Sequence, residues 1–246
     1  MSDTKPGYER IEGVQVGQYV SYRFFKVDPA WRRLPVEERE AGKDAFADVV
    51  EDWAGRMEGL RAYNLSGIRP EADFFLWQIT ERYDDLLDLG AALNGTPIAG
   101  WLTTPHAFLA TTKPSVYTDK KRVRQGRVIP REAPYLVVYP FVKKRPWYFL
   151  TFEERADAMR QHAEVGGKFV TVTNHTTYSF GIDDQEFVPA FECEEPADFM
   201  HLMMTLRKTE ASRWTEQDTP IFVGALAPIR SVLAALDGAA VHADAR

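Results

Sequence analysis

The segment Trp31-Arg32-Arg33-Leu34-Pro35-Val36-Glu37-Glu38-Arg39 returns in altered form as Trp147-Tyr148-Phe149-Leu150-Thr151-Phe152-Glu153-Glu154-Arg155. Both copies follow the pattern Trp-x-x-Leu-x-x-Glu-Glu-Arg, and they lie 116 residues apart. The correspondence continues at spacings of 114 and 113 residues, in Gly67-Ile68 with Gly181-Ile182 and in Asp85, Leu89 and Leu93 with Asp198, Leu202 and Leu206. Repetition over this length indicates that the chain contains two copies of one supersecondary unit.

Hydrophobic periodicity gives both halves the same order of elements, namely strand, helix, strand, strand, helix, strand. In the first half we predict elements over Gln18–Val27, Glu37–Trp53, Gly59–Ser66, Asp73–Thr80 and Tyr83–Asn94. In the second half they are Tyr135–Val142, Thr151–Glu164, Phe169–Phe180, Gln185–Glu192, Pro196–Glu210 and Ile221–Gly224. This order is that of a ferredoxin-like unit. We therefore predict an α+β fold of two tandem ferredoxin-like repeats, residues 1–125 and 126–246, whose antiparallel sheets meet face to face or curl into a barrel with flanking helices.

The composition is typical of a soluble protein. No stretch approaches the ~20 consecutive apolar residues of a membrane span. The first ten residues are polar and lack the apolar region of a secretory signal. Cys193 is the single cysteine of the sequence, so an internal disulfide cannot form. We therefore expect a cytoplasmic protein that has no membrane partner.

The net charge of −6 argues against nucleic acid as a partner, because phosphate binding needs a basic surface. Basic residues nevertheless gather in one part of the chain: Lys120, Lys121, Arg122, Arg124, Arg127 and Arg131, followed by Lys143, Lys144 and Arg145. Two interpretations stay open, a solvated loop or a positive surface that binds a small polyanion such as a ligand with several carboxylates. The absence of a Walker loop, a Gly-rich dinucleotide turn, a Cys-x-x-Cys pair and a His-Glu-x-x-His motif argues against several common enzyme classes.

The repeat also draws attention to one histidine. His162 corresponds to Phe46, the first residue of the apolar stripe on the equivalent helix, so an imidazole replaces a core phenylalanine. A lone histidine on a helix is often a structural residue. Here, however, the small pair Gly166-Gly167 follows and leaves room for a bulky group. Because no second His or Cys lies nearby in the sequence, a single axial ligand to haem iron is favoured over a zinc site.

Several longer motifs resemble those of the chlorite dismutase and coproheme decarboxylase superfamily, and the resemblance covers nearly the whole chain. These motifs are Tyr139-Pro140-Phe141-Val142-Lys143-Lys144-Arg145-Pro146-Trp147-Tyr148-Phe149-Leu150, Met159-Arg160-Gln161-His162, Gly181-Ile182-Asp183-Asp184-Gln185-Glu186-Phe187, Leu206-Arg207-Lys208-Thr209-Glu210-Ala211-Ser212-Arg213 and Asp218-Thr219-Pro220-Ile221-Phe222-Val223-Gly224. The resemblance implies a dimeric α+β barrel, usually assembled as a homopentamer. It also implies that haem b or coproheme (iron-coproporphyrin III) binds in the C-terminal half.

The resemblance implies roles for particular residues. It places the proximal iron ligand at His162 and the radical-forming tyrosine of the decarboxylase branch at Tyr139. It implies contacts with the porphyrin propionates at Ser115, Tyr117, Lys143 and Trp147. For Trp147, core packing is the alternative, because its repeat partner Trp31 has no ligand to contact.

In the decarboxylase branch, coproheme is both substrate and cofactor of a reaction in haem biosynthesis. Hydrogen peroxide oxidises the iron centre, the tyrosine is oxidised in turn, and two propionates lose carbon dioxide and become vinyl groups. The residues suit this chemistry. A phenol of pKa ~10 can give up a proton and an electron together, and a cluster of cations can bind the four carboxylates of coproheme.

The chain departs from the family pattern on the distal side of the porphyrin. Chlorite dismutases carry an arginine thirteen residues after the proximal histidine, and that position here is His175, which argues against chlorite dismutation. The glutamine of Gram-positive decarboxylases is also missing there. An actinobacterial branch uses a distal histidine seventeen residues before the tyrosine, where this chain has Arg122. Two interpretations of His175 stay open: an acid–base group that acts on peroxide, since a pKa of ~6.5 suits proton transfer near neutral pH, or a strand residue that points away from the pocket.

The leading hypothesis is thus a peroxide-dependent coproheme decarboxylase. The alternatives are a haem-binding protein with peroxidase-like activity and a haem carrier or sensor. We also expect a ring-shaped homo-oligomer, most simply the homopentamer of the family. Three aromatic residues, Trp53, Tyr63 and Phe108, are candidates for its contact surfaces.

Overall fold

The computed structural model describes residues 17–115, 117 and 126–242. The first half contains β1 (Tyr19–Val27), α1 (Val36–Ala54), β2 (Gly59–Asn64), β3 (Phe74–Thr80), α2 (Tyr83–Asn94), β4 (Leu102–Thr103) and β5 (Ala107–Thr111). The second contains β6 (Tyr135–Val138), β7 (Val142–Lys143), α3 (Phe152–Gly166), β8 (Val172–Asn174), β9 (Thr177–Tyr178), β10 (Phe187–Val188), β11 (Ala190–Cys193), α4 (Pro196–Leu206), β12 (Thr215–Gln217), β13 (Phe222–Leu226) and α5 (Ile229–Ala234). Among the described residues, no helix combines the length and the apolar character needed to cross a membrane.

The motif that opens each repeat forms the same local structure twice. Short 3₁₀ helices, η1 (Pro29–Arg33) and η3 (Arg145–Phe149), bury Trp31 and Trp147 and lead into α1 and α3. In each copy the N–H of the motif leucine donates to the carbonyl of the motif tryptophan, at 3.1 Å in the first and 3.4 Å in the second. The predicted repeat is therefore confirmed for this motif, because both copies form the same hydrogen-bonded turn.

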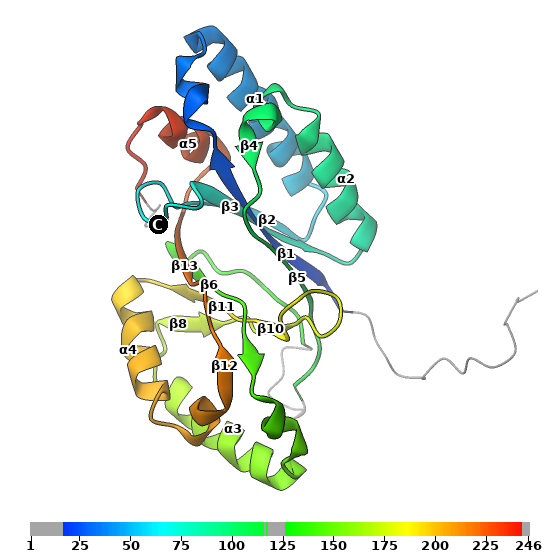
Figure 1. Ribbon diagram of the computed structural model, residues 1–246, viewed down its shortest axis with the longest axis vertical. Helices are drawn as coiled ribbons and strands as arrows, with labels where there is room; N and C mark the ends of the chain where they lie inside the picture. Colours follow the sequence, from blue (N-terminus) through cyan, green and yellow to red (C-terminus); the bar gives the residue numbers. More distant parts are fainter. Residues whose placement is uncertain (1–16, 116, 118–125, 243–246) are drawn as a thin grey trace, which may run out of the picture.

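Strands of both halves join into one curled sheet, whereas β7 and β12 pair with each other in a separate two-stranded sheet. The order of the curled sheet is β10-β9-β5-β1-β3-β2-β13-β6-β11-β8, and β4 pairs with β1 beside this path. The halves meet at two edges, because β13 pairs with β2 and β5 pairs with β9. The second of the two predicted arrangements, in which the sheets curl into a barrel, is thus the one that forms. Figure 1 shows the strands between α1, α2 and α5 at one end and α3 and α4 at the other.

The alternation of side chains along the strands separates two cores. Residues such as Phe24, Phe75 and Phe222 fill the interior between the two halves of the sheet. Along β6, Leu136 and Val138 face this interior, whereas Val137 and the following Tyr139 face the opposite way, toward α4. This parity decides on which side of the sheet each candidate site residue lies.

The helix-covered core of the first half is completed by residues from the end of the second. Ile229, Val232 and Leu233 of α5 pack with Phe46 of α1 in the same buried cluster. Beyond α5, a further 3₁₀ helix, η5 (Ala235–Asp237), carries a carboxylate that binds α1 through Lys43 at 2.8 Å and Arg39 at 2.6 Å. The boundary at residue 125 stays a prediction, but the C-terminal half evidently supplies part of the N-terminal core.

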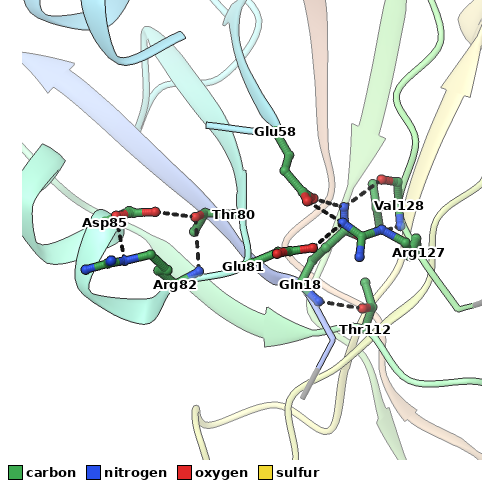
Figure 2. A network of polar contacts seen from close by, with 9 residues as sticks. All are labelled: Gln18, Glu58, Thr80, Glu81, Arg82, Asp85, Thr112, Arg127 and Val128. Carbon is green, nitrogen blue, oxygen red and sulfur yellow. Dashed lines mark hydrogen bonds and ion pairs between the residues drawn. The ribbon is translucent and has the colours of Figure 1, made fainter. Parts of the chain in front are cut away.

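The chain between the two halves is attached to the N-terminal sheet by the network in Figure 2. Arg127 binds the carboxylates of Glu58 and Glu81, the latter at 2.8 Å. Next to it, the buried amide of Gln18 accepts from the N–H of Val128 at 2.6 Å and donates to its carbonyl at 3.1 Å. The amide of Gln18 thus satisfies both backbone groups of Val128, as a neighbouring strand would. These bonds fix the position of Val128 against the N-terminal sheet.

Several predictions of detail were wrong. The segment Phe169–Phe180 is divided into β8 and β9, because its two parts pair with different strands, β11 and β5. The predicted helix Pro196–Glu210 ends at Leu206, and η4 (Glu210–Trp214) follows it. Tyr63 and Phe108 are 0% and 7% exposed inside the barrel, so they do not contribute to a contact surface. The closing strand of the first half was predicted without bounds and is β5, whereas α5 was not predicted.

Candidate functional site

His162 lies on α3, where the equivalent helix carries the core residue Phe46. Helix α3 starts at a capping box formed by Thr151 and Glu154, which fixes the direction of its first turn. The side chain of His162 is partly buried, and its Nδ1 is buried without a hydrogen-bond partner among the described residues. Burial, together with the positive charge of Lys143, lowers the pKa of His162 to about 4. At neutral pH the imidazole is therefore uncharged, which is the form that binds a metal, so His162 fits the role of a ligand to the iron of a porphyrin.

Lys143 and Trp147 form the packed layer next to α3. The ammonium group of Lys143 donates to the carbonyl of Ala211 at 2.8 Å and lies 4.6 Å from the centroid of the Trp147 ring. Burial lowers the pKa of Lys143 to about 8. Trp147 packs in turn against Trp214, with ring centroids 6.2 Å apart. The structure thus brings Lys143 and Trp147 together with His162, and it also gives Trp147 the packing role that the sequence left as an alternative.

Tyr139 follows β6 on the face of the sheet that α4 covers. Its ring is almost parallel to that of Phe191, with centroids 6.2 Å apart. Its hydroxyl lies 4.0 Å from the sulfur of Met203, the one hydrogen-bond partner that the described residues offer it. Burial raises the pKa of Tyr139, and the nearby carboxylate of Asp218 raises it further. The phenol is therefore neutral and is shielded from water.

Ser115 and Tyr117 lie close to the start of α3. The N–H of Tyr117 donates to the hydroxyl of Ser115 at 3.2 Å. The Tyr117 ring stacks on Phe152, the first residue of α3, with centroids 5.9 Å apart and planes 17° apart. The two predicted propionate contacts thus stand at the opposite end of α3 from the Gly166-Gly167 pair.

Glu186 is a residue of this region that sequence reasoning missed. Its carboxylate accepts from the backbone N–H of Lys143 at 2.8 Å and from the hydroxyl of Tyr148 at 2.5 Å. In the same motif, Asp183 accepts from the backbone N–H of Leu109 on β5 at 2.7 Å. The motif Gly181–Phe187 therefore ties the first half of the sheet to the turn that begins α3. An acidic residue inside a motif of the resemblance was the signal that could have found Glu186.

His175 lies on the other face of the sheet. Its Nε2 is 2.7 Å from the carboxylate of Glu192, and its ring centroid is 5.5 Å from that of Trp77 in the barrel interior. Glu192 is paired across the sheet with Leu136, which also faces this interior. The structure therefore does not bring His175 together with His162 and Tyr139. The neighbouring Asn174 is paired across the sheet with Phe191, so it is on the face of Tyr139.

The Glu192 carboxylate is the centre of a buried ionic network. It is 1% exposed, and it accepts from the backbone N–H of Arg131 at 2.8 and 2.9 Å and from the guanidinium of Arg61 at 3.2 Å. We expect Glu192→Gln to lower the free energy of unfolding by about 3 kcal/mol, because it removes one charge of a buried network. Urea denaturation measures this change.

The matched control is Glu51→Gln, which removes a carboxylate that pairs with Arg230 on the exposed surface of α1. That change should cost less than about 1 kcal/mol. Equal losses in the two variants would show that the interior network contributes no more than a surface pair.

The described members of the basic cluster are largely engaged with protein groups. The guanidinium of Arg127 binds the carboxylate of Glu58, and that of Arg131 donates to the hydroxyl of Thr173. The bond from Arg131 to Glu192 comes from its backbone N–H. Lys144 and Arg145 are exposed beside η3. Four members lie outside the described residues: Lys120, Lys121, Arg122 and Arg124.

A hollow of about 550 Å³ runs along the outer side of α3, toward η4. Its lining is Leu150, Glu154, Asp157, Ala158, Arg160, Gln161, Glu164, Glu210 and Trp214. Four of these residues are acidic and one is basic, so the electrostatic field in the hollow disfavours a ligand with four carboxylates. Neither His162 nor Tyr139 lines it.

Comparisons with known proteins identify the family and the fold. Residues 38–227 match the family model described as chlorite dismutase. The chain is 27% identical over 230 residues to the coproheme decarboxylase of Mycolicibacterium smegmatis, covering 89% of this chain and 94% of the relative. It is also 27% identical over 232 residues to the coproheme decarboxylase of Staphylococcus carnosus, covering 86% and 92%. The solved structure of chlorite dismutase from Candidatus Nitrospira defluvii in complex with imidazole superposes with a TM-score of 0.81 at 25% identity, covering 90% of this chain and 96% of that one.

Proposed function

Because the chain belongs to the chlorite dismutase family, we propose that it binds coproheme and decarboxylates it with hydrogen peroxide to form haem b. The observation that carries the proposal is the pair His162 and Tyr139. An uncharged imidazole, one of whose nitrogens has no hydrogen-bond partner among the described residues, lies on α3. A buried phenol lies on the face of the sheet that the C-terminal helices cover. Two relatives named coproheme decarboxylase, which align with most of the chain, support the choice of substrate.

Each residue has a defined part in this proposal. His162 holds the iron, and burial, together with the charge of Lys143, lowers the pKa of its imidazole and keeps it unprotonated. Tyr139 gives up its hydroxyl proton and an electron and recovers both at the end of the reaction. Bound coproheme would supply an iron centre that peroxide can oxidise and the two propionates whose carboxyl groups leave as carbon dioxide. Contacts with these propionates are proposed for Ser115, Tyr117, Lys143 and Trp147.

The second candidate is a haem-binding protein with peroxidase-like activity or a haem carrier. It is favoured by the orientation of His175, whose imidazole is bonded to Glu192 in the barrel interior. On the face of Tyr139, the same strand presents Asn174, and the exposed Thr176 donates to its side-chain oxygen at 2.7 Å. Neither side chain is a proton donor or acceptor of suitable pKa. An acid–base role for His175 stays a prediction, and the position of its imidazole in the barrel interior does not favour it.

Mass spectrometry of the porphyrin distinguishes these functions. The purified protein is mixed with iron-coproporphyrin III and hydrogen peroxide, and the porphyrin is extracted. We expect the mass of haem b, which has lost two carboxyl groups, and unchanged coproheme in the control without peroxide. Bound coproheme that keeps its mass with peroxide present would support the carrier or peroxidase-like function instead.

We further propose that the protein acts in the cytoplasm as a homopentamer. Large apolar side chains lie on its surface, including Phe149 at 87% and Val170 at 82% exposed, and neighbouring copies could cover them. Light scattering tests this assembly, and a mass of 28 kDa in solution would contradict it.

A further inference from the structure

The contact between Tyr139 and α4 involves sulfur. Met203 lies on the inner side of α4, and its Sδ is 4.0 Å from the Tyr139 hydroxyl. The surrounding cluster includes Phe191, Phe199 and Leu202 and is apolar. A thioether is a weak hydrogen-bond acceptor. The hydroxyl proposed to lose its proton therefore has a weak acceptor as its partner.

The charged groups nearest to this contact are already paired with each other. Arg207 follows α4 and binds the carboxylate of Asp218. The charges of the two residues act on Tyr139 in opposite directions, since Asp218 raises its pKa and Arg207 lowers it. The uncharged Met203 is thus the direct partner of the hydroxyl. A chemical change at its sulfur would therefore act directly on the hydrogen bond of Tyr139.

We propose that Met203 is an oxidative modification site that controls the hydrogen bond of the Tyr139 hydroxyl. A sulfur lone pair attacks one oxygen of hydrogen peroxide, the O–O bond breaks, and an S–O bond forms. The second peroxide oxygen takes up the remaining proton and leaves as water. Sulfur is oxidised by two electrons and peroxide is reduced by two. The product, methionine sulfoxide, is polar, and its oxygen is a much stronger acceptor than the thioether.

The same helix supplies internal comparisons. Met200 and Met204 are 51% and 61% exposed, whereas Met203 is partly buried. Exposure favours oxidation. Bulk peroxide should therefore oxidise Met200 and Met204 before Met203, but only the modification of Met203 should change the environment of Tyr139. Any effect of this modification on decarboxylation rests on the proposed function, whereas the modification itself and its effect on the Tyr139 hydroxyl do not.

The hydrogen bond is tested by NMR of the protein without porphyrin, labelled with ¹³C at the Cζ of tyrosine. Tyr139→Phe assigns the resonance. Met203→Leu, which keeps most of the side-chain volume, should shift the Tyr139 resonance, and Met203→Gln should shift it in the opposite direction because an amide oxygen is a stronger acceptor. Met204→Leu is the matched control and should leave it unchanged. A resonance that does not move in Met203→Leu would overturn the assignment of Met203 as the acceptor.

The modification is tested on the same protein with hydrogen peroxide and peptide mapping. In the double variant Met200→Leu/Met204→Leu, sulfoxide should form at Met203, and the Tyr139 resonance should shift at the same rate. A methionine sulfoxide reductase, after brief local opening, should restore both. The same peroxide treatment is applied to the wild type until Met200 and Met204 are fully oxidised. If Met203 then stays reduced both in the wild type and in the double variant, the proposal is wrong. Neither readout uses coproheme, so failure of the proposed function would leave these results intact.

Discussion

His162→Ala is expected to weaken the binding of ferric coproheme by more than about 100-fold, because it removes the imidazole that we assign as the iron ligand. Loss of a group that only supports a ligand already costs 10–100-fold in metal affinity, so loss of the ligand itself should exceed that range. Titration of the Soret band measures the affinity. Because His162 is only partly buried and Ala has a high helix propensity, α3 should persist in the variant.

The control is His201→Ala, which removes an exposed imidazole from α4. It should bind coproheme like the wild type. The pH dependence provides a further check, since the pKa of His162 is lowered to about 4. Its lone pair stays available as pH falls from 7, and protonation should compete with iron only as pH falls through about 4. Unchanged Soret spectra and affinity in His162→Ala would remove this residue from the site.

Tyr139→Phe is expected to bind coproheme but to form haem b at least ~100-fold more slowly, equivalent to ~2.7 kcal/mol in the activation barrier. The substitution removes the hydroxyl that is proposed to lose a proton and an electron, and it keeps the ring that packs on Phe191. Since a thioether is the one partner of the buried hydroxyl within the described part of the chain, removing the hydroxyl leaves little unsatisfied. Single-turnover mixing with peroxide, followed by porphyrin extraction, measures the rate.

Tyr135→Phe is the matched control, because Tyr135 is the first residue of the same strand and is partly buried. It should react like the wild type. Full activity in Tyr139→Phe would mean that another phenol, such as Tyr148 or Tyr178, takes the role, and that the assignment taken from the family resemblance is wrong for this chain.

The repeat predicted most of the helices because each copy contains its own start signal and its own apolar stripe. Helix α2 was predicted with its observed bounds, and α1 within one residue at each end. The pairing of β5 with β9 was beyond this reasoning, because it joins short strands of different halves that carry no alternating pattern. Repeat logic compares equivalent positions within the two copies, and it contains no information on contacts between them.

The orientation of His175 shows a second limit of the sequence. The residues around it, Thr173-Asn174-His175-Thr176, are all polar, so nothing in the pattern indicates which of them face the interior. Pairing with β11 sets the parity, and it places His175 beside Glu192. In contrast, the sequence singles out His162 as a candidate ligand, because its equivalent in the other copy is Phe46, a phenylalanine in a core position.

The packing of α5 on the first half has a consequence for synthesis on the ribosome. Ile229, Val232 and Leu233 complete a core whose members from the first half were made more than a hundred residues earlier. Chains usually fold domain by domain as they emerge, N-terminal part first. Here the N-terminal repeat must wait with an uncovered apolar surface until nearly the whole chain has been translated. Chaperones that recognise exposed apolar surface should therefore bind to nascent chains that are stalled before residue 229.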